Sequence, residues 1–329
     1  MIYTTIYLSI FYVLMTLSII FFSKKMSLYD HPSDRKIHKS KILNTGGISI
    51  YMFYIFIVSS FELNAFIENI IIFGFFVLIS GFLDDILKLS PGVKLILILF
   101  PSTYLIYNGF KIDSLGVYEY INTLYLGKFS FIFSLLCVGL LINAINYTDG
   151  IDGLTLIIVI FSLTYFTFLL SDEDLKFLFY LLLIPLIINL FFNLLSINTG
   201  YKLFLGDSGS LFLGFLLSFI LIYLSVYEKI HPTMLIWSVW YPVYDFIFVT
   251  FKRISIKISP FTPRKDHAHH VLYFKLKRNN FLILIFFSFL NLFFITLGYC
   301  LSNYLGKIYA LFSFCFIFFV YTYIRNKFN

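Results

Sequence analysis

Five short polar clusters interrupt a chain of 329 residues that is otherwise strongly apolar. Each cluster adjoins an apolar run long enough to cross a lipid bilayer. A charged side chain at the centre of a membrane helix costs about 2.5–3.5 kcal/mol, so carboxylates beside such runs usually serve a site. The clusters are residues 30–38 (DHPSDRKIH), 84–85 (DD), 146–153 (NYTDGIDG), 206–210 (GDSGS) and 267–270 (HAHH).

The acidic pair Asp84 and Asp85 suits a hard cation. Adjacent side chains on a helix point about 100° apart, so one acid can face a site while the other faces a neighbour. Two carboxylates at a water-accessible helix end suit Mg²⁺, or a base whose pKa is tuned by its twin. Taken alone, the pair could equally be a solvated helix end capped by acids.

The cluster 146–153 carries three oxygen-bearing side chains. If the segment is helical, Asn146, Asp149 and Asp152 share one face at intervals of three residues. The glycines between them permit a sharp turn or a close approach of the backbone to a ligand. A purely structural loop does not need such a stripe, so we expect it to line a site.

The GDSGS cluster opens the apolar run that begins at Leu211. An acid with small residues and free backbone N–H groups at a helix N-terminus suits phosphate or a metal–phosphate pair. The alternative is a helix cap formed by the side chain of Asp207 or Ser208.

Histidines and basic residues form the other two clusters. Three of the residues 267–270 are His, with Arg264 and Lys265 just before them. Zinc spacing is absent and no thiol is near, which favours phosphate binding or proton transfer over a metal site, with a solvated loop as the alternative. The basic segment 30–41 fits either a topology signal or a site for an anionic substrate.

One further acid, Asp245, lies one or two turns inside an apolar run. Ionisable groups at that depth usually face other helices or a water-filled cavity. We expect Asp245 to face the helix bundle, either paired with a basic group or lining the site.

Composition indicates an all-α integral membrane protein. Hydrophobic residues make up 60% of the chain and charged residues 12%, with a mean hydropathy of +0.91. A soluble protein of this length could not bury so much apolar surface. The first run, 2–22, has no basic stretch before it and no cleavage site after it, so we expect a retained span.

Apolar runs of about 17–25 residues predict eleven transmembrane helices in a single domain, 1–329. All but five of the 24 Lys and Arg residues then lie on one side, which the positive-inside rule assigns to the cytoplasm. The N-terminus is expected outside and the C-terminus inside. All five clusters lie on the cytoplasmic side, and the net charge of +7 follows this asymmetry instead of indicating nucleic acid binding. The predicted spans are 2–22, 46–62, 67–83, 94–110, 129–145, 154–170, 175–195, 211–227, 233–251, 280–300 and 307–324.

The order of the motifs resembles that of the polyprenyl-phosphate N-acetylhexosamine-1-phosphate transferases of glycosyltransferase family 4. The motifs are DxPxxRKxH…GG, FLDDxxxLSPxxK, NxxNxxDGxDGL, GDxGSxxLG and HxHH, in this order over about residues 30–275. HAHH is similar to the WecA- and TagO-like branch, whereas the related MraY branch carries consecutive histidines. The Pro that often precedes the Gly pair is missing, because residues 42–45 are ILNT.

This resemblance implies transfer of an N-acetylhexosamine 1-phosphate, with GlcNAc-1-phosphate preferred, from a UDP-sugar to undecaprenyl phosphate. UMP is released, and the product initiates a lipid-linked glycan of the cell envelope. The implied cofactor is Mg²⁺, with Mn²⁺ as a second option, and the implied location is the inner (cytoplasmic) membrane. The partners are undecaprenyl phosphate and the UDP-N-acetylhexosamine donor, and a homodimer is compatible with them.

Two alternative functions remain. One is phospho-N-acetylmuramoyl-pentapeptide transfer in peptidoglycan synthesis, which the histidine motif disfavours. The other, in a different class, is a membrane transporter. A transporter would place its ionisable groups near the bilayer midplane, whereas only Asp245 lies clearly inside a predicted span.

The resemblance also implies residue roles. Asp207 is the principal metal ligand with Asp84 and Asp85 beside it, and one of these two deprotonates or orients the lipid phosphate. The expected catalytic residues are Asp84, Asp85, Asp149, Asp152 and His267. The expected substrate-binding residues are Arg35, His38, Lys39, Lys94, Asn146, Arg264, His269 and His270.

Overall fold

The computed structural model describes residues 2–30, 32, 40–260, 262 and 264–328, and helices dominate this part of the chain. Arg35, His38 and Lys39 lie outside the described residues, so their predicted roles stay predictions. The N-terminal elements are α1 (Ile2–Lys25), β1 (Tyr29–Asp30), β2 (Ile42–Leu43), α2 (Gly46–Ser60), α3 (Ala65–Leu87), α4 (Pro91–Tyr107), β3 (Ser114–Tyr118), β4 (Asn122–Tyr125), η1 (Gly127–Phe129) and α5 (Ser130–Thr148).

The remaining elements complete the bundle and add one short helix, α11, after α10. They are α6 (Leu154–Leu169), α7 (Glu173–Leu194), η2 (Ile197–Thr199), α8 (Gly206–Val226), α9 (Pro232–Leu235), η3 (Ile236–Val239), α10 (Trp240–Ser255), α11 (Ala268–Lys275), α12 (Asn280–Cys300), η4 (Leu301–Leu305) and α13 (Lys307–Phe328).

Each of the eleven predicted spans coincides with one helix or, for 233–251, with the continuous stretch Pro232–Ser255. Among the described residues, eight helices are long and apolar enough to cross a membrane. The other three, α2, α4 and α6, have 15, 17 and 16 residues. The all-α class is therefore confirmed.

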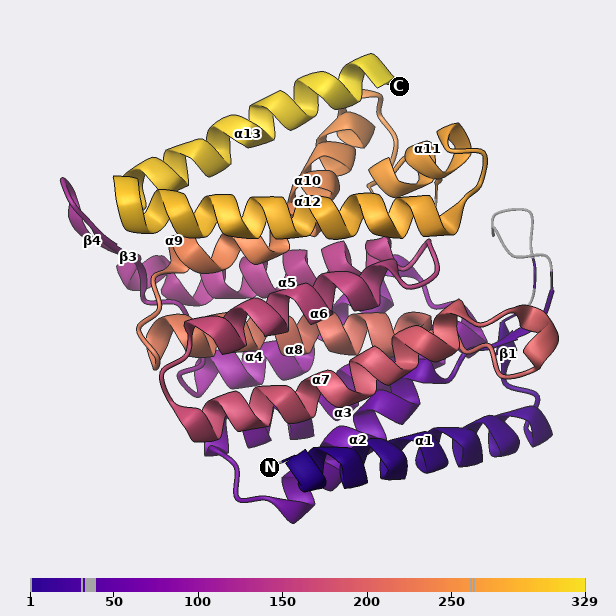
Figure 1. The fold of residues 1–329 in the computed structure, drawn as a ribbon. Coiled ribbons are helices and arrows are strands. Elements are labelled where there is room, and N and C mark those ends of the chain that lie inside the picture. Colours follow the sequence, from indigo (N-terminus) through magenta and orange to yellow (C-terminus); the bar gives the residue numbers. More distant parts are fainter. Residues whose placement is uncertain (1, 31, 33–39, 261, 263, 329) are drawn as a thin grey trace.

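The helices lie roughly side by side (Figure 1). One end of the bundle carries β1, α11 and the C-terminus, and the opposite end carries the N-terminus and the β3–β4 hairpin. The site described below is built from helix termini. Helices α3 and α5 end, and α6, α8 and α11 begin, within or next to the polar clusters, and α4 begins six residues after Asp85.

Helix α8 lies in the interior and contacts α2, α3 and α5 along its length. Almost all of its side chains are buried, from Ser208 to Leu224. Small residues allow the closest contacts: a Cβ on Gly47 of α2 would lie 2.1 Å from the Cα of Gly209. Helices surrounded by lipid and by each other lack a water-facing side, and small residues let their backbones approach.

Candidate functional site

Two carboxylates converge on one ammonium group at the centre of the site. The Nζ of Lys94 lies 2.9 Å from Oδ2 of Asp84 and 2.8 Å from Oδ2 of Asp207. Asp84 belongs to the last turn of α3, Lys94 to the first turn of α4 and Asp207 to the first turn of α8. All three side chains are partly buried, so water screens their charges less than at a surface.

The turn between α3 and α4 is itself fixed by Asp84. Its Oδ1 accepts a hydrogen bond of 2.8 Å from the backbone N–H of Leu89. Lys88 takes the left-handed conformation at the end of α3, and Ser90 caps α4 by accepting from the N–H of Val93. The motif DDxxxLSPxxK therefore encodes a tight helix–helix turn that brings Lys94 back to Asp84.

Asp85 caps the N-terminus of α8 from a neighbouring helix. Its carboxylate oxygens accept from the backbone N–H groups of Asp207 at 3.3 Å and Ser208 at 3.4 Å. The alternative interpretation, a cap by the side chain of Asp207 or Ser208, is excluded, because α8 begins at Gly206 and has no local side-chain cap. The amides at 207 and 208 are not free for phosphate either, since a carboxylate already occupies the positive end of the helix dipole.

Asn146, near the end of α5, connects to the same carboxylate. Its Nδ2 donates to Oδ1 of Asp207 at 3.0 Å and to Oγ of Ser210 at 2.8 Å. Both oxygens of Asp207 are thus engaged, one by Lys94 and one by Asn146. The structure therefore brings together Asp84, Lys94, Asn146 and Asp207, as the sequence predicted.

The Gly pair of the first motif also meets this group. The N–H groups of Gly46 and Gly47 donate to the carbonyls of Phe204 and Leu205, each at 2.9 Å. These carbonyls belong to the segment that leads directly into α8. Strand β2, which pairs with β1, is attached to the same segment, because the carbonyl of Leu43 accepts from the N–H of Phe204 at 2.8 Å.

The predicted helical stripe of Asn146, Asp149 and Asp152 is wrong. Helix α5 ends at Thr148, and turns follow until α6 begins at Leu154. Gly153, directly before α6, adopts φ of +79°, a conformation that other residues rarely take, so the segment between the two helices is not helical. The three side chains therefore have different surroundings.

Asp152 is directed away from the carboxylate group. Its Oδ2 lies 2.7 Å from Nζ of Lys202 and 3.2 Å from Nδ2 of Asn280. It thereby connects the α5–α6 turn to the segment before α8 and to the start of α12. These contacts hold three segments of the chain together. A catalytic role for Asp152 stays a prediction.

Asp149, by contrast, forms no side-chain hydrogen bond or ion pair with any described residue. Burial raises the pKa of its carboxyl well above the usual value, and the nearby carboxylates of Asp207 and Asp85 raise it further. A carboxyl group in these surroundings keeps its proton to higher pH than a solvated one.

The histidine motif packs against the same turn. A Cβ on Gly150 would lie 2.4 Å from Cε1 of His270 and 3.0 Å from Nε2 of His269. Nδ1 of His269 is 2.7 Å from the hydroxyl of Tyr241, while its Nε2 is buried without a hydrogen-bond partner among the described residues. His269 and His270 therefore pack against Gly150, the residue that follows Asp149 in the chain.

Both of these histidines are held neutral. Burial lowers the pKa of His269 well below its usual value and that of His270 to about 4, and neighbouring histidines add to both effects. At neutral pH they can donate or accept hydrogen bonds but carry no positive charge. This state favours proton transfer or hydrogen bonding over attraction of phosphate by charge.

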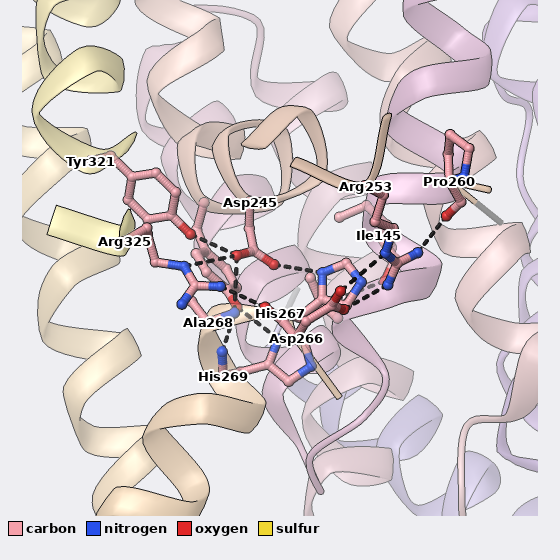
Figure 2. Close-up of polar contacts among 12 residues, drawn as sticks. Ile145, Asp245, Arg253, Pro260, Asp266, His267, Ala268, His269, Tyr321 and Arg325 are labelled. Atoms are coloured by element: carbon pink, nitrogen blue, oxygen red, sulfur yellow. Dashed lines mark hydrogen bonds and ion pairs between the residues drawn. The ribbon is translucent and has the colours of Figure 1, made fainter. Parts of the chain in front are cut away.

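His267, the first histidine, is paired with Asp245 of α10 (Figure 2). Its Nδ1 lies 2.7 Å from Oδ2 of Asp245, and the N–H of Ala268 donates to Oδ1 at 3.0 Å. The expectation that Asp245 pairs with a basic group is therefore confirmed. The ring of His267 is 5.2 Å from that of Tyr147, on α5 next to Asn146. Arg264 is exposed and makes no such contact with the described residues, so its predicted role stays a prediction.

Arg253 and Asp266 belong to this region but were not predicted. Arg253 is buried and binds Asp266 through two hydrogen bonds, of 3.1 Å from Nε and 2.6 Å from Nη2. It also donates to the carbonyl of Pro260. Arg253 lowers the pKa of the Asp266 carboxyl against the effect of burial. The sequence shows both residues only as members of a charged loop.

The carboxylates of Asp84 and Asp207 are candidate ligands for a metal ion. No group of three or more His, Cys, Asp or Glu side chains in the described part of the chain could hold a metal ion. Mg²⁺, however, is usually bound by one or two carboxylates together with water and substrate phosphates. Asp84 and Asp207 already surround a cation, the ammonium of Lys94, so their donor chemistry fits Mg²⁺.

Comparisons with known proteins agree with the motifs. Residues 67–225 match glycosyl transferase family 4. The chain is 29% identical over 256 residues to the undecaprenyl-phosphate alpha-N-acetylglucosaminyl 1-phosphate transferase of Yersinia pestis, covering 75% of this chain and 70% of that protein. It is 28% identical over 266 residues to the enzyme with the same name from Escherichia coli (strain K12), covering 76% and 70%.

A third similar protein comes from a different bacterial group. The probable undecaprenyl-phosphate N-acetylglucosaminyl 1-phosphate transferase of Bacillus subtilis (strain 168) is 28% identical over 253 residues, covering 75% of this chain and 70% of the relative. These matches confirm the resemblance seen in the motifs. Asp84, Asp85, Lys94, Asn146 and Asp207 all lie within the family match, whereas the histidine motif follows it.

Proposed function

We propose that this protein, whose residues 67–225 belong to glycosyl transferase family 4, transfers GlcNAc-1-phosphate from UDP-GlcNAc to undecaprenyl phosphate and releases UMP. The observation that carries the proposal is the convergence of Asp84, Asp207 and Lys94, joined by Asn146, at the helix ends. The names of the relatives support the choice of acceptor and sugar. They disfavour the muramoyl-pentapeptide alternative, because none of the three relatives carries that name.

We place the site at the cytoplasmic face of the inner membrane, with eleven helices crossing it. The excess of Lys and Arg at this end supports the orientation. The N-terminus then lies outside and the C-terminus inside. A homodimer stays a prediction.

The proposed reaction joins two phosphates in one displacement. An oxygen of undecaprenyl phosphate attacks the phosphorus that carries the sugar, the bond from that phosphorus to the oxygen of UMP breaks, and UMP leaves with the electron pair. Phosphoryl transfer of this kind depends on alignment and charge neutralisation more than on covalent chemistry. The protein therefore has to hold two anionic reactants close together in a fixed geometry.

Lys94 and the carboxylates serve this need. Lys94 presents a cation at the point where Asp84 and Asp207 meet. Asp84 and Asp207 are the residues that would hold Mg²⁺ or Mn²⁺, which when bound would neutralise phosphate charge. Asn146 keeps the Asp207 carboxylate in a fixed orientation through its 3.0 Å hydrogen bond.

Asp149 is the best placed proton acceptor. Asp85 is occupied by the amides of α8, and Asp84 by Lys94 and the N–H of Leu89. The carboxyl group of Asp149 makes no hydrogen bond with the described residues and has a raised pKa, which suits a group that removes a proton from the lipid phosphate. Neutral His269 and His270 pack against the next residue in the chain, Gly150.

The test is a donor panel with the purified protein in detergent or liposomes. Undecaprenyl phosphate and Mg²⁺ are supplied with UDP-GlcNAc, UDP-GalNAc or UDP-N-acetylmuramoyl-pentapeptide, and UMP release is measured. We expect UMP release and a lipid-linked diphosphate sugar with UDP-GlcNAc, and a loss of about 10²- to 10³-fold in Asp207→Asn.

Two results would overturn the proposal. One is the absence of UMP release from every donor while a known transferase is active under the same conditions. The other is turnover of the muramoyl-pentapeptide donor in preference to UDP-GlcNAc. Normal turnover by a folded Asp207→Asn protein would instead remove Asp207 from the site.

A further inference from the structure

The final helix reaches into the polar network around Asp245 (Figure 2). The hydroxyl of Tyr321 donates to Oδ1 of Asp245 at 2.6 Å, and Nε of Arg325 lies 3.8 Å from the same oxygen. Nη2 of Arg325 donates to the backbone carbonyl of Asp266 at 2.6 Å. Tyr321 and Arg325 lie in the last two turns of α13, well beyond the region that matches the family.

Arg325 is an unusual residue for the end of a peripheral membrane helix. Basic residues at such ends normally reach into water, yet only 5% of Arg325 is exposed. Its guanidinium also lies 5.1 Å from the ring centre of Phe248. A buried guanidinium that contacts a carboxylate, a carbonyl and an aromatic ring is held in one orientation and holds these groups together.

Helix α13 contacts the bundle through one narrow stripe. Phe314, Phe318, Tyr321 and Arg325 follow the spacing of one helix face and lie against α10, where Tyr244 contacts the first three. Most of the other large side chains of α13 are exposed, as expected for a helix that faces lipid. The stripe therefore directs both polar groups to Asp245 and its surroundings.

Asp245 connects Tyr321 and Arg325 to the histidine motif. Its Oδ1 accepts hydrogen bonds from the hydroxyl of Tyr321 and the N–H of Ala268, and its Oδ2 is hydrogen-bonded to Nδ1 of His267. The bond to Ala268 fixes the first turn of α11, which carries His269 and His270. A hydrogen bond that holds one ring nitrogen of a histidine determines which face and which tautomer the ring presents.

We propose that Tyr321 and Arg325 are positioning residues for the proposed transferase. Tyr321 holds Asp245, and Arg325 holds both Asp245 and the backbone at Asp266, so that together they fix His267 and the start of α11 beside Asp149 and Gly150. Two residues of α13 thus position the histidine motif of the proposed active site. The inference rests on the proposed function only for its kinetic readout.

The first measurement compares matched pairs of variants on α13. Tyr321→Phe and Arg325→Gln remove the contacts, while Tyr323→Phe and Lys327→Gln change exposed neighbours on the other face. We expect kcat for UMP release to fall about 10-fold in each of the first pair, with little change in KM for undecaprenyl phosphate. The control pair should match the wild type.

A double-variant cycle separates positioning from general stability. If Tyr321 acts through His267, then Tyr321→Phe should add no further loss of kcat to a His267→Asn protein. A Tyr321→Phe effect of the same size in both backgrounds would overturn the proposal, because it would show that Tyr321 acts independently of His267.

Hydrogen exchange provides a readout that needs no turnover. Tyr321→Phe and Arg325→Gln should speed amide exchange in residues 264–275 and leave α3 and α8 unchanged. Unchanged exchange in 264–275, or faster exchange throughout the chain, would overturn the proposal. If the wild-type protein releases no UMP, the proposed function fails, while the exchange experiment still decides whether α13 holds the histidine motif.

Discussion

The two halves of the site are held in different ways. The carboxylate half lies at the ends of α3, α4 and α8, where α3 packs against α4 and against the buried helix α8. The histidine half lies on a short helix and loop that polar contacts attach to α10 and α13. In an apolar stretch of 18 residues within each helix, 83% of the stretch is buried in α8 but only 11% is buried in α13.

We infer from this difference that the carboxylate half is rigid and the histidine half is adjustable. A metal–phosphate site needs rigid ligands, and tight helix packing supplies them. A loop that admits and releases a nucleotide sugar has to adjust, and a few hydrogen bonds permit local motion more readily than a packed core. We therefore expect substitutions in the first half to remove activity and substitutions in the second half to lower it by degrees.

The largest effect should follow Lys94→Gln in the carboxylate half. Without the ammonium, Asp84 and Asp207 face each other with no cation between them, so repulsion should lower both activity and stability. We expect kcat to fall by about 10²-fold. The melting temperature should fall without Mg²⁺ and recover as Mg²⁺ is added, more steeply than in the wild type.

Lys111→Gln is the control, because Lys111 forms an exposed ion pair with Asp113 near the hairpin at the opposite end. It should change neither property. Equal Mg²⁺ dependence of melting in Lys94→Gln and wild-type protein would contradict the assignment of Asp84 and Asp207 as the residues that hold the ion.

A smaller effect should follow Gly150→Ala, which acts on the histidine half. The added methyl group would lie 2.4 Å from the ring of His270, so the histidine motif has to move away from Asp149. We expect kcat to fall about 10-fold while the protein keeps its fold, because this half is adjustable. UMP release and circular dichroism give the two measurements.

Gly92→Ala provides the matched comparison, since a Cβ on Gly92 meets nothing within 4 Å. That variant should resemble the wild type. A Gly150→Ala protein with full activity would show that contact between the turn and the histidines is not required for turnover.

The smallest effect should be a pH-dependent gain in stability in Asp149→Asn. Because the pKa of Asp149 is raised in the fold, its contribution to stability is fully present below the unfolded pKa and is lost as pH rises through the folded pKa. Asparagine removes this loss. The melting temperature of the variant should therefore exceed that of the wild type by roughly 1–3 °C at pH 8 and not at pH 4.

Activity of the same variant should fall, since the proposed proton acceptor is gone. The Asp152→Asn protein provides a contrast, because Asp152 is paired with Lys202 and its loss should destabilise the protein instead. A melting curve of Asp149→Asn that matches the wild type from pH 4 to pH 8 would show that the carboxyl is not perturbed.

Much of the carboxylate half was predictable from the sequence. The motif FLDDxxxLSPxxK fixes a short turn, so local geometry alone returns Lys94 to Asp84. The predicted stripe at 146–153 is wrong because α5 ends at Thr148, so Asn146, Asp149 and Asp152 do not lie on one helix. Periodicity applies only within a helix, and Gly150 and Gly153 lie between two of them.

The supports of the histidine half could not be predicted. Tyr321 is one of 25 tyrosines and lies 76 residues from Asp245, which it contacts. Arg325 counted only as a basic residue after the last span, where basic residues usually mark topology. Only the packing of α13 on α10 distinguishes these two residues from their exposed neighbours Tyr323 and Lys327.

The position of α13 has a consequence for the lipid environment. One face of this helix is exposed along its length, and its last turns are fixed by Arg325 to the histidine loop. A bilayer that is too thin or too thick for a helix is accommodated by tilting that helix. Tilting of α13 would move Tyr321 and Arg325 relative to Asp245 on α10, so we expect the thickness of the surrounding bilayer to affect the contact between Asp245 and His267.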